Sequence, residues 1–99
     1  MDKNFGGIIW TNHALDRLRE RGIKQGDAWV TFNRPQESRK GNSGNWVYYR
    51  NWDGTQIEVV AKKNEKGEWL VLSVWSRTVY KNKEGKTPFW KYIFNQIYG

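Results

Sequence analysis

The chain has 99 residues, which suits one small domain, and it carries a net charge of +7. It has no cysteine and a single histidine, so disulfides and thiolate metal sites are excluded and a zinc site is not expected. No apolar run is long enough to span a membrane, and the N-terminus lacks a signal-peptide pattern. We therefore expect one soluble, cytoplasmic domain over residues 1–99, with no cofactor and no metal.

The first helix is predicted in the segment NHALDRLRERG (12–22), after a flexible lead-in at 1–7 and a short apolar run at 8–10. Thr11 is a suitable N-cap, because its hydroxyl can accept a hydrogen bond from the first turn. Gly22 can adopt the left-handed conformation that ends a helix. The apolar positions recur at helical spacing and predict a buried stripe made of Ala14, Leu15 and Leu18.

A second short helix is predicted from about residue 25 to residue 33, and Pro35 prevents its continuation. The polar segment ESRKGNSGN (37–45) is predicted to be a loop or a frayed edge strand. A hairpin signal at Asp53–Gly54 then joins two of three β-rich segments. The predicted strands are 46–52, 56–63 and 68–80, and they form an antiparallel meander.

A closing helix is predicted at 87–98, where Thr87 and Pro88 suit the first turn and an apolar stripe can pack on the sheet. The predicted fold class is α+β. Two N-terminal helices pack on an antiparallel meander of three to four strands, and the C-terminal helix is added to them.

Alternation along the strands predicts which side chains share a face of the sheet. In the last strand, Leu70, Leu72 and Val74 form an aliphatic set that suits the core. The opposite face is predicted to be the working face. Its expected members are Tyr48, Arg50, Lys62, Ser73, Trp75 and Arg77.

A cationic stripe is predicted on the first helix, where His13, Arg17 and Arg21 are spaced four residues apart. Three such side chains in a row repel one another, which favours a bound phosphate between them. The alternative is a solvated helix face, in which Asp16 and Glu20 partly neutralise the row. A neutral imidazole at His13 suits a general base, whereas the alternative is a structural residue at the helix start.

Composition favours single-stranded RNA as the partner. Basic charge attracts phosphate backbones, and aromatic faces stack on unpaired bases. The chain has seven tryptophans, five tyrosines and four phenylalanines. The alternative is that the aromatic residues only fill the core and that the charge only aids solubility.

The segments WTNHALDRLRERGI (10–23) and DAWVTFNRP (27–35) together resemble a family of small bacterial domains of unknown function. Its members carry His-Ala, spaced arginines, Arg-Gly-Ile and a short helix that ends in Asn-Pro, a pair that Arg34 interrupts here. The resemblance covers residues 8–77, and Ser73 matches a hydroxyl residue in the family's final strand. That family looks related to the RelE-like toxin superfamily, which includes metal-independent endoribonucleases.

This resemblance implies that RNA lies on the face of the sheet opposite the helices. It implies that His13 is the acid–base residue, that Arg17 and Arg21 hold the phosphate and that Ser73 lines the site. It also raises an antitoxin protein as a partner. Cleavage would form a 2′,3′-cyclic phosphate, with Lys62, Tyr48 and Arg77 as candidates for the acid. Further RNA contacts are expected from Arg39, Arg50, Trp75 and Arg77.

Two other interpretations stay open. The first is a non-catalytic RNA-binding module, which uses the same stripe with Trp75, Tyr48 and Trp52 as stacking platforms. The second is a protein-interaction domain, whose interface is the aromatic face or the closing helix.

Overall fold

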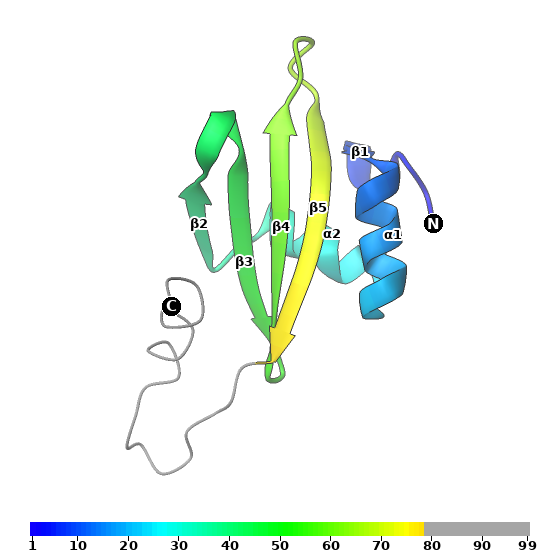
Figure 1. The fold of residues 1–99 in the computed structure, drawn as a ribbon, viewed down its shortest axis with the longest axis vertical. Helices are drawn as coiled ribbons and strands as arrows, with labels where there is room; N and C mark the ends of the chain where they lie inside the picture. Colours follow the sequence, from blue (N-terminus) through cyan, green and yellow to red (C-terminus); the bar gives the residue numbers. More distant parts are fainter. Residues whose placement is uncertain (79–99) are drawn as a thin grey trace.

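The computed structural model describes residues 1–78, which form a five-stranded sheet and two α-helices (Figure 1). The α+β class is confirmed, and the closing helix predicted at 87–98 lies outside the described residues. The strands and α-helices in chain order are β1 (Ile9–Trp10), α1 (Asn12–Arg21), α2 (Gln25–Asn33), β2 (Glu37–Lys40), β3 (Trp46–Trp52), β4 (Thr55–Lys63) and β5 (Trp69–Thr78), and short 3-10 helices lie at Phe5–Gly7 and Asn42–Gly44. No helix within residues 1–78 is both long enough and apolar enough to cross a membrane.

The sheet has five strands and is mixed: the predicted antiparallel meander is present as β2-β3-β4-β5, and the parallel strand β1 is added to it, so the predicted count of three to four is too low. Its strand order is β1-β5-β4-β3-β2. The two-residue strand β1 runs parallel to β5, with Ile9 opposite Leu70. Strand β2 forms the far edge, with Glu37 opposite Tyr49. Strands β1 and β2 are short, and every side chain of the exposed edge strand β2 is polar. Neither strand therefore shows the alternation of apolar and polar residues that predicts a strand.

Helix α1 begins and ends where the sequence predicts. The Thr11 hydroxyl accepts a hydrogen bond from the Ala14 N–H at 3.2 Å and donates one to the Val71 carbonyl at 2.9 Å. Gly22 has a φ of 62°, and the chain then turns back so that the Ile23 N–H donates to the Leu18 carbonyl at 2.9 Å. The cap at Thr11 therefore also fixes the start of α1 against β5.

Helix α2 covers one face of the sheet and is drawn behind it in Figure 1. Its fully buried Thr31 donates to the Asp27 carbonyl at 2.9 Å and accepts from the indole Nε1–H of Trp52 at 3.2 Å. This side-chain contact joins α2 to β3, and it places Trp52 on the helix-covered face. The prediction that Trp52 is an open stacking platform is therefore wrong.

A β-bulge in β5 changes which of its side chains are buried. Val60 pairs with Ser73 whereas Ala61 pairs with Val71, so Leu72 is the extra residue. The bulge reverses the alternation, and Val71 is fully buried together with Val74. The prediction that Leu70 and Leu72 share the core face is wrong, since both are only partly buried.

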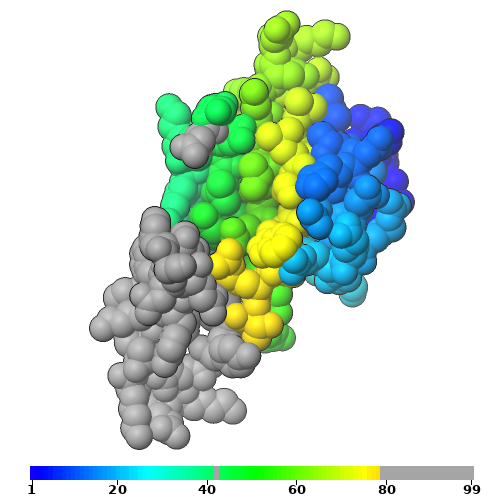
Figure 2. Space-filling view, in the orientation of Figure 1, coloured from blue at the N-terminus to red at the C-terminus, as the bar shows by residue number. Residues whose placement is uncertain are grey.

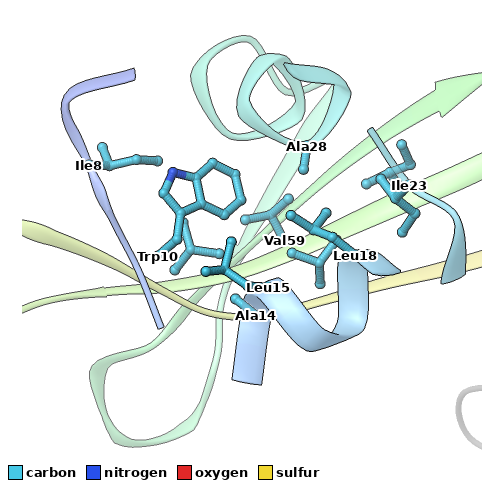
Figure 3. Close-up of a cluster of buried hydrophobic side chains, with 11 residues drawn as sticks. Ile8, Trp10, Ala14, Leu15, Leu18, Ile23, Ala28 and Val59 are labelled. Atoms are coloured by element: carbon cyan, nitrogen blue, oxygen red, sulfur yellow. The ribbon is translucent and has the colours of Figure 1, made fainter. Parts of the chain in front are cut away.

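The core lies between the helices and the sheet and is centred on Trp10 (Figure 3). Trp10 is 1% exposed, and its indole Nε1–H donates to the Phe5 carbonyl at 2.9 Å. Phe5 lies in the segment predicted as a flexible lead-in, yet its ring packs edge-on against Trp10 and Trp29. The other buried hydrophobic members are Ile8, Ala14, Leu15, Leu18, Ile23, Ala28, Ile57, Val59, Val71 and Val74.

Candidate nucleic-acid interface

The face of the sheet opposite α2, called the open face below, is turned to the viewer in Figures 1 and 2. The strand register assigns its members, because residues opposite one another in paired strands share a face. They include Arg39, Val47, Tyr49, Glu58, Val60, Lys62, Ser73, Trp75 and Arg77. Of the predicted working face, Lys62, Ser73, Trp75 and Arg77 are therefore brought together here.

Helix α1 lies along the side of β5 and runs in the same direction (Figure 1). Thr11 bonds to the carbonyls of Val71 and Leu72, whereas Arg21, at the other end of α1, reaches the Ser76 carbonyl with its Nη1 at 3.4 Å. The cationic stripe of α1 therefore runs beside the open face. Its first member, His13, lies at the end of α1 that meets Val71 and Leu72.

Trp75 is the residue on which the stripe converges. The guanidinium carbon of Arg21 lies over its ring, 3.2 Å from the ring centroid, and that of Arg17 lies 5.7 Å from the centroid. Residues four apart on an α-helix drift by roughly 40° around its axis, so successive members of the stripe differ in their distance from β5. A guanidinium stacked on an indole keeps its N–H donors in its own plane, where an anion can reach them.

The structure provides a partner for most of the stripe without a phosphate. Arg17 Nη1 lies 3.0 Å from Glu20 Oε1, and the ring face of Trp75 is itself attractive to a cation. Within the described residues, Arg21 pairs with no carboxylate. The crowding of charge on α1 is therefore no longer an argument for a bound anion, and Arg21 is the member of the stripe best placed to accept one. His13 is exposed to solvent.

A row of side chains crosses the open face from Trp75 through Glu58 and Tyr49 to the edge strand. Glu58 Oε2 lies 2.7 Å from Arg77 Nε, and the two side chains are 13% and 22% exposed. Arg39 lies 5.8 Å from the Tyr49 ring centroid, and its Nε is 3.2 Å from Glu37 Oε1. The open face therefore carries carboxylates as well as the predicted cations.

Tyr49 and Glu58 are site residues that the sequence analysis did not select. Burial raises the pKa of the Tyr49 hydroxyl above its ordinary value, and the Glu58 carboxylate raises this pKa further. The hydroxyl is therefore protonated at neutral pH and can donate a hydrogen bond. Alternation along the strand predicts that Tyr48 and Tyr49 point to opposite faces of the sheet. Only the register with β4 and β5 shows that Tyr49 is the one that shares a face with Trp75.

Tyr48 and Arg50 lie on the helix-covered face, so the prediction that they share the working face is wrong. Tyr48 pairs with the buried Val59, and its ring contacts Phe32 with centroids 5.1 Å apart. Arg50 Nη1 donates to the Arg34 carbonyl at 2.7 Å. The reason is the phase of β3, whose even-numbered residues face α2. Tyr48 therefore does not share the open face with the other two candidate acids, Lys62 and Arg77.

A model of the family described as a domain of unknown function (DUF4258) matches residues 10–81. The chain belongs to the DUF4258 family. No curated protein and no solved structure matches it.

The DUF4258 segment runs from β1 through β5 and contains the stripe of α1 together with all the open-face residues named above. The open face is thus part of the family's own domain. Within the described residues of the segment, no three metal-ligating side chains gather into a cluster. The chemistry of the face is that of arginine, tryptophan, tyrosine and carboxylate.

Proposed function

We propose that the open face binds single-stranded RNA. Arg21 and Arg17 contact a phosphate, and bases stack on the surface that these two arginines form with Trp75. The observation that carries the proposal is the position of both guanidinium groups over the exposed ring of Trp75. Single-stranded RNA is held by such combinations, because bases stack on guanidinium planes as well as on aromatic rings. The net charge of +7 adds a general attraction to phosphate.

Arg21→Ala tests this proposal, with Arg19→Ala as its matched control. Both arginines lie in the last turn of α1, but Arg19 pairs with Asp16 and is 63% exposed. The affinity for a fluorescent oligoribonucleotide is measured by anisotropy over a series of salt concentrations. Arg21→Ala is expected to weaken binding and to reduce the salt slope by about one unit. Arg19→Ala is expected to change both much less.

If both variants lose the same amount of RNA affinity, only the overall charge attracts the RNA. The open face would then no longer be identified as the binding surface. Weak RNA binding that neither variant changes would instead favour a domain that binds proteins. Arg21→Lys adds a further test, because it keeps the charge but loses the planar group that stacks on Trp75. It is expected to bind less tightly than the native chain at every salt concentration.

A second candidate function is metal-independent cleavage of the bound RNA, as the RelE-like resemblance implies. It is favoured by the course of α1, whose first turn carries His13 beside the stretch of β5 that leads into Ser73. In this mechanism His13 takes the proton of a ribose 2′-OH, and O2′ bonds to phosphorus. The bond from phosphorus to O5′ then breaks, and an acid gives O5′ a proton. The candidate acids that share the open face are Lys62, Arg77 and Tyr49.

Cleavage is tested with end-labelled RNA in excess chelator, comparing the native chain with His13→Ala. Loss of a positioned base is expected to slow cleavage by roughly 100- to 10,000-fold. Binding is expected to stay within a few-fold, since Arg17 and Arg21 remain. A 2′,3′-cyclic phosphate end identifies the reaction. Equal cleavage by both proteins would end the role of His13, and no cleavage at any protein concentration would leave an RNA-binding module.

A further inference from the structure

The helix-covered face of the sheet is not covered along its whole length. α2 ends at Asn33, and its Phe32 packs edge-on against Tyr48 and Trp69, with ring centroids 5.1 and 5.4 Å away. Past this aromatic contact, where β3 begins and β4 ends, lies a hollow of about 510 Å³. Its walls include Trp46, Tyr48, Trp69, Lys62, Lys63 and Ser38.

The hollow offers flat aromatic surface with one ring open to solvent. Trp46 is 37% exposed, and it pairs with the buried Ala61, so it stands on the same face as the core. Tyr48 and Trp69 form the inner wall, with their rings 6.2 Å apart and at 76° to one another. A planar ring that enters the hollow can therefore stack on Trp46 and meet the edges of the inner rings.

The polar groups of the hollow suit an anion. Lys62 and Lys63 both line it, but only Lys63 stands on the same face of the sheet as Trp46. The Nζ of Lys63 lies 5.4 Å from the Trp69 ring centroid. No carboxylate is among the lining residues that the structure describes. The hydroxyls of Ser38 and Tyr48 can donate or accept hydrogen bonds, and burial raises the pKa of Tyr48, which keeps it protonated. Ligand sites of this size combine aromatic walls with a few such polar groups.

We propose that this hollow binds a nucleotide, with the base stacked on Trp46 and the phosphate held by Lys63. The same chemistry is offered by a free nucleoside monophosphate and by one nucleotide of an RNA strand. The site lies on the opposite side of the sheet from Trp75 and uses none of its arginines. The proposed nucleotide site can therefore be tested separately from the proposed RNA interface.

The experiment is an NMR titration of the full chain, following the indole N–H signals of its seven tryptophans. The ligands are AMP, adenosine, inorganic phosphate and a short oligoribonucleotide. AMP is expected to shift the Trp46 signal and to bind more tightly than adenosine or phosphate alone. If the oligoribonucleotide binds the hollow more tightly than AMP does, the source is an RNA strand; the reverse order identifies a free nucleotide.

Trp46→Ala and Trp75→Ala form a matched pair, because their side chains are 37% and 38% exposed. AMP binding in the hollow is followed at the indole signal of Trp69, which lines it. At this signal, loss of the stacking ring in Trp46→Ala is expected to weaken AMP binding by about 5- to 100-fold, whereas Trp75→Ala, outside the hollow, leaves the affinity unchanged. Trp46→Phe keeps a ring and is expected to restore most of the affinity, which guards against a folding defect. Lys63→Gln is expected to weaken AMP but not adenosine, with the exposed Lys66→Gln as its control.

The proposal is overturned if AMP does not bind, or if Trp46→Ala and Trp75→Ala weaken it alike. It is also overturned if AMP and adenosine bind equally well, because Lys63 would then hold no phosphate. RNA binding that depends on Arg21 would survive each of these results. Conversely, AMP binding in the hollow would survive a failure of the RNA interface.

Discussion

Trp46 and Trp75 are almost equally exposed, but they stand on opposite sides of one sheet in different chemical surroundings. Trp75 lies on an open surface beneath two guanidinium groups and beside a carboxylate. Trp46 lines a hollow with two further aromatic rings and two lysines. Exposed apolar surface costs free energy in water, so each arrangement needs its own explanation.

The two surroundings suit ligands of different shape. An open surface with arginine planes suits an extended strand, which contacts it through several phosphates and bases. A hollow between aromatic side chains suits a single ring, which can stack on Trp46 and contact the inner rings. We assume that both tryptophans act in binding and contribute little to the stability of the fold.

The largest predicted effect tests that assumption against the buried Trp10. Trp10→Ala is expected to lower the free energy of unfolding by about 3–5 kcal/mol, since the ring is fully packed and a cavity remains. Trp46→Ala and Trp75→Ala are each expected to cost less than about 1 kcal/mol. Urea unfolding followed by circular dichroism measures all three. If replacing an exposed tryptophan lowers the free energy of unfolding as much as Trp10→Ala does, that tryptophan is a structural residue. The binding role proposed for it would then be wrong.

An intermediate effect is predicted for Glu58, the carboxylate beside Trp75. Glu58→Gln leaves the guanidinium of Arg77 without its ion-pair partner in a partly buried position, at a cost of about 1–3 kcal/mol. The same change removes a negative charge from the open face, so RNA is expected to bind several-fold more tightly at low salt. Stability and affinity thus move in opposite directions.

Glu65→Gln is the control for this pair of measurements. Glu65 is exposed in the turn between β4 and β5. Its replacement by Gln removes the same charge from the chain. If it raises RNA affinity as much as Glu58→Gln does, the effect is one of net charge. The open face would then have no special part in binding.

Local signals were enough to predict the helices and the central strands. Thr11 and Gly22 delimit α1, Pro35 follows α2, and the Asp53–Gly54 turn forms with positive φ at both residues. These features depend on neighbours in the chain. The stripe of α1 was likewise predicted, because residues four apart on a helix share a side whatever it packs against.

The composition of the site depended on contacts between distant segments, and these could not be predicted. The alternation of β3 separates Tyr48 from Tyr49 but does not say which of them faces α2. The bulge at Leu72 reverses the facing of half of β5 and has no local signature. Arg21 could be selected from the sequence, whereas its stacking on Trp75 required the packing of α1 beside β5.

The smallest predicted effect uses Tyr48 and Tyr49, adjacent residues on opposite faces. Both have a pKa above the ordinary value, but Tyr48 owes its shift to burial alone, whereas Glu58 adds to the shift of Tyr49. Glu58→Gln is therefore expected to lower the pKa of Tyr49 and to leave that of Tyr48 unchanged. The ring carbon signals of the two tyrosines, followed by NMR from neutral to strongly alkaline pH, measure both values.

The same shifts predict how stability depends on alkaline pH. A tyrosine whose pKa is raised by folding favours the folded state fully below its unfolded value of 10, and this contribution is lost as the pH rises through the folded value. Tyr49→Phe removes one ionising group, so stability is expected to fall less steeply above pH 10. Equal responses of Tyr48 and Tyr49 to Glu58→Gln would mean that the sheet does not separate the two environments. The open face and the hollow would then not be electrostatically independent, and the contrast between Trp75 and Trp46 would lose its physical basis.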